Sequence, residues 1–392
     1  MRPVLISHIY INRDVLDSAF AKNIISKLPD TPVTISDAPP EQLESSSITE
    51  GKRLLYITTY KGNFCKPCPG TSHDYICCNY QVINETTGCP LDCAYCILQS
   101  YMSSSVLTVY ANYHKILEEF DVFTAKFPER IIRIGTGELA DSLALEEYTG
   151  ISSLLIPYFS TKPNIFFELK SKTNHVRHLE SFRNKTNNLV LSWSLNPDQV
   201  IKDIEFKTAS LEERFESAAL AEKMGFKLGF HFDPVIFYEE WESGYGNVIE
   251  QLFNSINPAN IAWISIGGLR FPPSLKETIR DRFPGTSIIR GEQITGKDQK
   301  TRYFKPIRLQ MFRSIYSRIR NYSPEVFVYF CMEDKEIWKK VMDFTPASTN
   351  HLDFMFAESL YHRFPEMNLT KPVYEKYLSF ESIHDPAIQS AI

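Results

Sequence analysis

The sequence predicts an α/β protein in which parallel strands are joined by crossover helices. Along residues 76–283 of the 392-residue chain, short apolar runs alternate with longer amphipathic runs, which gives six strand–helix units. With 43% hydrophobic and 23% charged residues, the composition is that of an ordinary globular protein with room for a sizeable core. Six units are too few for a complete eight-fold barrel.

The expected strands are short apolar runs, and the expected helices carry apolar residues at helical spacing. The strands are expected at residues 54–58, 76–83, 131–135, 165–169, 189–194, 228–233 and 261–267. The helices are expected at residues 107–127, 145–159, 175–184, 211–224, 245–255 and 274–283. Before them, residues 14–28 have helical periodicity, and residues 30–52 are rich in Pro, Ser and Glu and are expected to be irregular.

The pattern changes after residue 283. A stretch rich in Gly, Lys and Gln (291–300) leads to a basic helix at 306–321, a strand at 326–331 and a helix at 335–341. We therefore divide the chain into an N-terminal extension (1–75), a barrel region (76–283) and a C-terminal extension (284–392) that closes one side of the barrel.

Charge and hydropathy limit the cellular compartment and the binding partners that we expect. No run reaches the ~20 apolar residues that a membrane span needs, and the N-terminus has no signal peptide, so a cytoplasmic protein without a membrane partner is expected. The net charge of −5 gives no hint of nucleic acid, but residues 270–320 contain 13 Lys and Arg against 4 Asp and Glu. Such a stretch follows a phosphate backbone or forms a solvated helical face.

Three cysteines carry the strongest chemical signal in the chain. Cys89, Cys93 and Cys96 have C-x3-C-x2-C spacing, with Tyr95 before the last of them. Three thiolates hold three irons of a [4Fe–4S] cube, whereas a cluster used only for electron transfer normally takes four. The iron without a protein ligand is then open to chemistry, as is the open position of a catalytic zinc. A zinc knuckle would need four ligands, and a disulfide framework suits small secreted chains.

This segment resembles the signature of the radical S-adenosylmethionine (SAM) superfamily. In that superfamily the open iron chelates the amino and carboxylate groups of SAM, and one electron cleaves the sulfonium to methionine and a 5′-deoxyadenosyl radical. The resemblance implies an open partial (β/α)6 TIM-like barrel, a [4Fe–4S] cluster and SAM as cofactors, and an electron donor such as flavodoxin or ferredoxin. Cys89, Cys93, Cys96 and Tyr95 form the expected catalytic set.

A Gly-rich segment ends the second barrel strand and is the second expected part of the cofactor site. Gly135, Thr136, Gly137 and Glu138 follow the cysteines by one helix and one strand. Glycines let backbone groups approach a ligand closely, and a carboxylate beside them accepts hydrogen bonds from an ammonium group. In the superfamily a segment of this kind binds the methionine amino group of SAM. A plain turn at a strand end is the alternative.

From about residue 10 to 330 the chain resembles the spore photoproduct lyase family. The resemblance is carried by residues 65–67, 80–81, 87–99, 172, 175–176, 194–196, 200–201 and 229–234. It implies that Lys172 pairs with the carboxylate of SAM, that Ser142 and Ser194 hydrogen-bond to SAM, and that Tyr95 and the backbone at Asp233 line its adenosine. Otherwise Lys172 caps a strand, and Ser194 and Asp233 are turn residues before the prolines that follow them.

The chain departs from that family at two positions. The lyase returns hydrogen to its thymine-dimer product from a cysteine just after the second barrel strand, where residues 135–141 here contain none. It also uses a tyrosine directly after the last cluster cysteine, where this chain has Ile97. We expect hydrogen abstraction from a damaged pyrimidine in DNA. The alternatives are the same chemistry on another substrate, or a non-catalytic cysteine-rich protein that binds metal or nucleic acid.

Other residues leave several interpretations open. Cys65, Cys68, Cys77 and Cys78 precede the motif and are candidates for a second cluster, a structural zinc, a hydrogen donor or buried thiols. Cys331, inside an apolar run, is expected to be a core thiol.

Two further segments carry alternatives of their own. His231 is expected to be a core histidine rather than a proton carrier. The run from Arg302 to Lys305 interleaves charge with aromatic rings, as single-strand binders do, or forms an ordinary hairpin.

Overall fold

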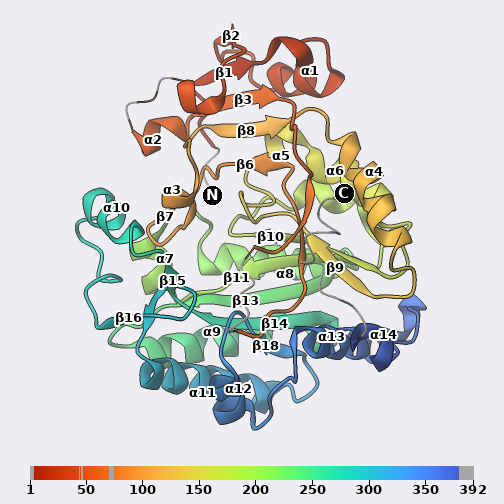
Figure 1. The fold of residues 1–392 in the computed structure, drawn as a ribbon, viewed down its shortest axis with the longest axis vertical. Coiled ribbons are helices and arrows are strands. Elements are labelled where there is room, and N and C mark those ends of the chain that lie inside the picture. The colour runs from red at the N-terminus through yellow and green to blue at the C-terminus, as the bar shows by residue number, and fades with distance from the viewer. Residues whose placement is uncertain (1–3, 44, 46, 70–74, 379–392) are drawn as a thin grey trace.

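A sheet of eight strands curls into a half-barrel at the centre of the molecule (Figure 1). The computed structural model describes residues 4–43, 45, 47–69 and 75–378, so the outermost residues of both predicted extensions lie outside the described residues. In sheet order the strands are β18 (Val328–Phe330), β14 (Ile261–Gly268), β13 (Lys227–Val235), β11 (Leu189–Ser194), β10 (Ile165–Ser171), β9 (Ile132–Gly135), β5 (Gln81–Ile83) and β4 (Cys65–Pro67). All neighbours pair in parallel except β4 with β5.

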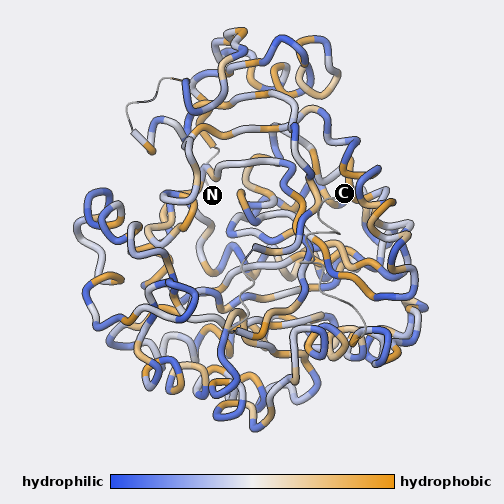
Figure 2. Tube along the Cα trace, viewed as in Figure 1, coloured by the Kyte–Doolittle hydropathy of each residue, from blue (hydrophilic) through white to orange (hydrophobic). Residues whose placement is uncertain are grey.

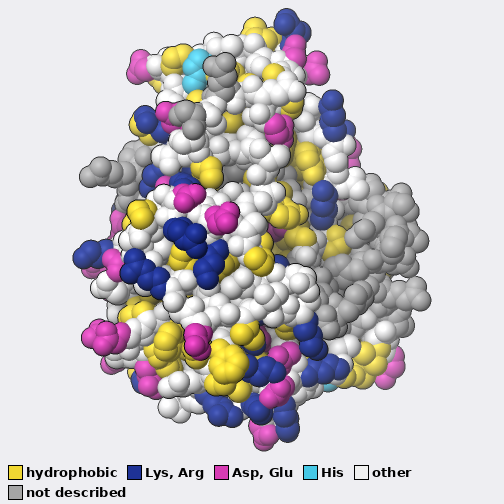
Figure 3. All heavy atoms as spheres, turned by 60° about the vertical axis from the view of Figure 1, so that its left-hand side comes forward, with side chains coloured by type: hydrophobic (Ala, Val, Ile, Leu, Met, Phe, Trp, Pro, Cys, Tyr) yellow, Lys and Arg dark blue, Asp and Glu magenta, His cyan; other side chains and the backbone are white. Residues whose placement is uncertain are grey.

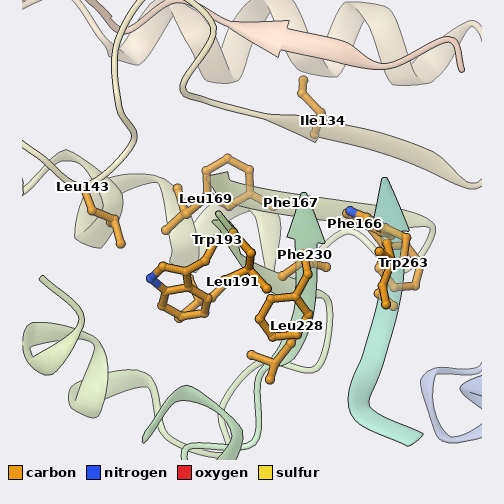
Figure 4. Packing of buried hydrophobic residues seen from close by; sticks show 14 of the residues in the cluster. Ile134, Leu143, Phe166, Phe167, Leu169, Leu191, Trp193, Leu228, Phe230 and Trp263 are labelled. Atoms are coloured by element: carbon orange, nitrogen blue, oxygen red, sulfur yellow. The ribbon is translucent and has the colours of Figure 1, made fainter. Parts of the chain in front are cut away.

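The six strands predicted for the barrel are the six in the middle of this order, from β14 to β5, which confirms the open partial barrel. Their side chains are largely buried, and Trp193, Phe230 and Trp263 are among the large side chains of the core (Figure 4). Parallel strands covered in this way are rich in apolar residues, as the sequence pattern indicated. Because their carboxyl ends meet at one edge, residues that follow different strands come together there.

Hydrophilic and hydrophobic residues alternate along the helices that cover the sheet (Figure 2). They are α4 (His114–Ala125), α6 (Ile151–Phe159), α7 (Asp198–Ile204), α8 (Leu211–Lys223), α9 (Trp241–Ser255), α10 (Leu275–Arg282), α11 (Lys305–Tyr322), α12 (Lys335–Met342) and α13 (Thr349–Arg363). The N-terminus of α8 is fixed by a capping box between Ser210 and Glu213. In the part of the chain that the structure describes, no helix is long and apolar enough to cross a membrane.

The N-terminal residues form a second sheet rather than an irregular extension. Its strands are β2 (Val33–Ile35), β1 (His8–Ile11), β3 (Leu54–Thr58), β8 (Leu107–Tyr110) and β6 (Thr86–Thr87). The strand predicted at 54–58 is confirmed, whereas the helix predicted at 107–127 is wrong over its first turn. Residues 107–110 are β-branched, aromatic or leucine and pair in parallel with β3, so sheet contacts override the helical spacing.

Three further boundaries differ from the sequence prediction. The helix expected at 145–159 is divided into α5 (Glu146–Thr149) and α6, because Gly150 has a left-handed backbone with φ of 61°. Residues 177–182 form a 3₁₀ helix rather than an α-helix. The strand expected at 76–83 is reduced to β5, after Asn79, whose φ is 52°.

The residues after 283 contribute to the barrel itself. β18 extends the sheet beyond β14, and α11 packs beside α9 and α12. A small antiparallel sheet contains β15 (Arg270–Phe271), β17 (Thr301–Tyr303) and β16 (Gln293–Thr295). Figure 1 shows it at the left of the half-barrel. The C-terminal segment thus borders the carboxyl edge on the side of β13, β14 and β18.

Candidate active site

The cysteine loop runs from β6 through β7 (Asp92–Cys93) to α3 (Leu98–Tyr101). β7 pairs with β12 (Glu205–Phe206), a two-strand ladder that fixes Cys93 opposite Glu205. Gly88 has a φ of 86°, and its N–H donates to the Leu139 carbonyl over 2.9 Å. This bond joins the cysteine loop to the segment after β9, so the two sequence motifs meet at the carboxyl edge of the barrel.

None of the three motif thiols is in a disulfide, and they are close enough for their charges to act on one another. Cys93 is buried, whereas Cys89 and Cys96 are partly exposed and line a cavity of about 340 Å³ between the loop, α2 (Ile48–Gly51) and residues 102–105. Burial raises the pKa of Cys89 to about 12, and the charges of Asp141 and Cys96 add to this effect. Three adjacent thiols without a fourth cysteine in the loop fit the ligand set of a site-differentiated [4Fe–4S] cluster.

The segment after β9 is tightly built. A Cβ at Gly135 would lie 2.1 Å from the Tyr80 hydroxyl, and Gly137 has a φ of 91°. Ser142 accepts hydrogen bonds from the Thr136 hydroxyl at 2.7 Å and from the Lys170 N–H at 2.9 Å. The Ser142 hydroxyl therefore braces this segment against β10.

Glu138 is half-buried beside Asn84, and the two offer acceptors at this edge. Burial raises the pKa of Glu138, and a hydrogen bond from Asn84 opposes the rise. The Oδ1 atom of Asn84 is buried and has no hydrogen-bond partner among the described residues. A buried acceptor of this kind is costly unless a ligand supplies the donor, so the pair fits an ammonium group.

Lys172 and Ser194 lie together at the ends of β10 and β11. The Lys172 ammonium donates to the Ser194 hydroxyl over 2.9 Å and stands 5.9 Å from the centroid of the Tyr95 ring. Burial raises the pKa of the Cys93 thiol, as does the charge of Glu205, and the Lys172 charge opposes both. Lys172 thus faces the cysteine loop.

Tyr95 belongs to a buried network that sequence reasoning missed. Its hydroxyl donates to Glu205, which also accepts from Asn196 at 2.9 Å and from Arg214 at 2.7 Å. Burial raises the pKa of Glu205, but the charges of Arg214 and Lys172 outweigh it and lower that pKa to about 2. Glu205 and Arg214 stand 110 and 119 positions after Tyr95, and no local pattern marks them.

Asp233 lies apart from these residues, at the end of β13. Its carboxylate forms a two-pronged ion pair with Arg270, at 3.0 and 3.2 Å, and a cis peptide joins it to Pro234. The Arg270 guanidinium also donates to the Cys331 sulfur over 3.2 Å. Cys331 is therefore not a core thiol among apolar side chains, because it follows β18 at the carboxyl edge and contacts a charged pair.

His231 is a satisfied interior histidine, as predicted. Its Nε2 lies 2.9 Å from Glu168 and its Nδ1 lies 2.7 Å from the Ser265 hydroxyl. Burial lowers its pKa, and the Lys170 charge lowers it further. Both ring nitrogens are engaged inside the barrel, which leaves neither for proton transfer at the edge.

In the run from Arg302 to Lys305, Arg302 and Tyr303 are buried and Phe304 is exposed, and residues 301–303 pair with β16 in a hairpin. Arg302 is 2% exposed, pairs with Asp298 at 2.5 Å and lies over the Tyr75 ring. The Tyr303 hydroxyl accepts from the Phe237 N–H over 3.2 Å inside the protein. The hairpin interpretation is the correct one.

The four upstream cysteines do not form a metal site in this geometry. Among the described residues, which include these four and the three motif cysteines, no group of three or more His, Cys, Asp or Glu side chains is placed to hold a metal ion, so the assignment of the motif thiols as ligands depends on their spacing in the sequence. Cys65 is buried in β4, and its thiol donates to the Ile116 carbonyl over 3.9 Å. Cys78 is also buried, and its carbonyl accepts from Arg133. The structure gives no support to a second cluster or a zinc here.

Comparison with known proteins places these features in a family. The family model "Spore photoproduct lyase" matches residues 74–320. The spore photoproduct lyase of Clostridium acetobutylicum is 25% identical over 288 residues, which cover 71% of this chain and 83% of that protein. The Bacillus subtilis enzyme is 27% identical over 236 residues, which cover 59% of this chain and 66% of that protein.

Solved structures give the same fold. A mutant of spore photoproduct lyase superposes with a TM-score of 0.74 at 20% identity, over 84% of this chain and 100% of that chain. Another mutant, with bound AdoMet and dinucleoside spore photoproduct, gives 0.72 at 20% identity over the same shares. The chain thus belongs to the spore photoproduct lyase family of radical SAM enzymes.

Proposed function

We propose that Cys89, Cys93 and Cys96 hold a [4Fe–4S] cluster and that SAM binds between this loop and the segment from Gly135 to Glu138. The observation that carries the proposal is the hydrogen bond from Gly88 to Leu139, because it joins the thiol loop to the acceptor-rich segment at one edge. When bound, the cluster and SAM supply a 5′-deoxyadenosyl radical that takes hydrogen from a substrate.

Each side of the edge has its own proposed role in holding SAM. Glu138 and the orphan oxygen of Asn84 accept from its ammonium group, with the backbone of Gly135, Thr136 and Gly137 close by. Ser142 supports this segment through its bonds to Thr136 and Lys170.

The carboxylate and adenosine sides are proposed from the neighbouring strand ends. The Lys172 ammonium, held by Ser194, pairs with the SAM carboxylate. Tyr95, fixed by Glu205, and the backbone at Asp233 line the adenosine. Flavodoxin or ferredoxin is the proposed electron donor.

A damaged pyrimidine in DNA is the proposed substrate. The support is the family assignment, together with a solved relative that carries dinucleoside spore photoproduct. A second candidate is the same radical chemistry on another substrate. It is favoured by Ile97 and by the absence of cysteine from residues 135–141, where the family's hydrogen-return residues would stand.

Anaerobic reconstitution with iron and sulfide, followed by SAM and dithionite, tests the proposal. We expect about four irons per chain, formation of 5′-deoxyadenosine, and reversal of dinucleotide spore photoproduct to thymines. Formation of deoxyadenosine without repair of the lesion would contradict the proposed substrate but agree with the proposed cofactor site. No deoxyadenosine from protein loaded with iron would overturn the site itself.

Iron counting in the variant that lacks Cys89, Cys93 and Cys96 provides the matched control. We expect it to hold no cluster. Iron retained there in stoichiometric amount would contradict the ligand assignment and point to the upstream cysteines.

A further inference from the structure

The last turn of α10 reaches the cysteine loop from the other end of the barrel region. Arg282 is mostly buried, with 14% of its side chain exposed, and donates to Asp92 over 2.8 Å and to Thr49 over 3.2 Å. It also donates to the Oε1 atom of Gln99. One guanidinium thus contacts residues on both sides of Cys93.

Gln99 links Arg282 to the cysteines that would hold the cluster. Its amide nitrogen donates toward the carbonyl oxygens of Cys93 at 3.2 Å, Ala94 at 3.1 Å and Cys96 at 3.2 Å. A guanidinium has donors only, so it binds the oxygen of Gln99 and turns the amide nitrogen toward the loop. Arg282 therefore fixes the orientation of the group that closes the loop.

Asp92 links Arg282 to a second cation. The Lys52 ammonium, on a side chain with 7% exposure, lies 2.9 Å from Asp92 and donates to the Leu91 carbonyl over 2.5 Å. Lys207 lies 3.8 Å from the same carboxylate. Three cations surround one carboxylate, so these four side chains together carry a net positive charge beside the cysteine loop. On the side of the molecule that Figure 3 brings forward, Lys and Arg side chains gather beside acidic ones.

We propose that Arg282 is a positioning residue for the cysteine loop, which acts through Gln99 and Asp92 to hold the ligand backbone and to raise the reduction potential of the cluster. The inference rests on the proposed function, because it needs a cluster at Cys89, Cys93 and Cys96. Positive charge and hydrogen bonds around the ligands favour the reduced, more negative cluster. Loss of such outer contacts typically lowers metal affinity or activity about 10- to 100-fold.

The test compares Arg282→Gln with Arg280→Gln in the full reconstituted chain. Arg280 lies on the same helix but is exposed, and no hydrogen bond joins it to the loop. We expect Arg282→Gln to shift the midpoint potential to more negative values and to alter the EPR signal of the reduced cluster. We expect Arg280→Gln to match the wild type in both. Equal potentials and EPR signals in the two variants would overturn the inference.

Two conservative variants keep the test decisive if Arg282→Gln fails to fold. Arg282→Lys retains the charge near Asp92 but lacks the fork that also reaches Gln99. Gln99→Leu retains Arg282 and removes the link to the carbonyls. We expect Arg282→Lys to restore most of the potential and Gln99→Leu to change the EPR signal more than the potential. Wild-type behaviour of both would sink the inference, whereas a wild type without any cluster would sink the proposed function.

Discussion

Two regions of the barrel mouth treat their polar groups differently. The cofactor region, formed by the cysteine loop, Asn84, Glu205, residues 135–142 and the ends of β10 and β11, contains an acceptor on Asn84 without a partner among the described residues and a Lys172 ammonium that donates to the Ser194 hydroxyl. The hairpin region, formed by the ends of β13, β14 and β18 with β15 and β17, pairs Asp233 with Arg270 and Asp298 with Arg302. The first region leaves a buried acceptor without a partner in the described part of the chain, whereas the second pairs its charged groups with one another.

This difference bears on which region can take up a charged ligand. A site for an amino acid headgroup needs unpaired acceptors and an ammonium, and the cofactor region has both. The hairpin region offers a thiol, Cys331, beside an internal ion pair rather than a free charge. The family assignment therefore bears more directly on the cofactor site than on the substrate.

The largest expected effect is the loss of SAM cleavage on Cys93→Ala. The thiol lies on a loop outside the barrel core, so circular dichroism should match the wild type while deoxyadenosine formation disappears. Cys331→Ala, in the hairpin region, is the matched cysteine control and should still form deoxyadenosine. If Cys93→Ala kept its turnover, or Cys331→Ala lost its iron, the division into two regions would fail.

The next effect is on stability rather than chemistry. Arg270→Met leaves Asp233 buried without its partner, which should lower the free energy of unfolding by about 3–5 kcal/mol. Chemical denaturation measures this loss, and the affinity for SAM should change little, because the proposed contact of Asp233 with the adenosine is made by its backbone. The double variant Arg270→Met with Asp233→Asn should recover part of the loss, because it no longer buries an unpaired charge. A large change in SAM affinity without a change in stability would place Arg270 in the cofactor site.

Lys172→Ala should weaken SAM binding while leaving the cluster in place. Removal of a charge-assisted hydrogen bond costs about 1.5–3 kcal/mol, which corresponds to a loss of affinity of about 10- to 100-fold. Equilibrium binding to the reconstituted protein measures it. Lys172→Arg should restore part of the affinity, and Lys162→Ala, which removes a surface ion pair with Asp121, should have no effect. Unchanged binding in Lys172→Ala would return Lys172 to the role of a strand cap.

Much of the fold could be predicted because its strands carry their own signal. β11 is found at the predicted residues, because its run of Leu, Val and Trp is too short for a helix and lies between Asn188 and Pro197. The error at β8 arose where a strand runs directly into a helix, so one window held both patterns.

The site was predictable only where its residues are adjacent in sequence. The spacing of Cys89, Cys93 and Cys96 can be recognised in the sequence, whereas Arg282 contacts Gln99 across 183 positions. Such contacts depend on how α10 packs on α3, which no local pattern encodes. Asn84 is similar, because an orphan oxygen becomes visible only once every neighbour has been placed.

A fall in pH should lower the free energy of unfolding through both regions, and to a similar extent. In each region one carboxyl, Glu205 or Asp233, has a pKa near 2 against ordinary values of 4.5 and 3.8, because neighbouring arginines outweigh the effect of burial. Groups with lowered folded-state pKa values contribute stability that is complete above the unfolded-state pKa and is lost as the pH falls toward the folded-state value. At 1.36 kcal/mol per unit, each carboxyl contributes about 2 to 3 kcal/mol of the free energy of unfolding near neutral pH.

Unfolding curves measured from about pH 5 to about pH 3 should therefore show a steady loss of stability in the wild type. Arg270→Met removes the arginine that lowers the pKa of Asp233 and should flatten the Asp233 share of this loss. The Glu205 share should remain, since Arg214 is untouched. An acid slope in Arg270→Met equal to that of the wild type would show that the ion pair of the hairpin region does not hold the Asp233 carboxyl in its charged form.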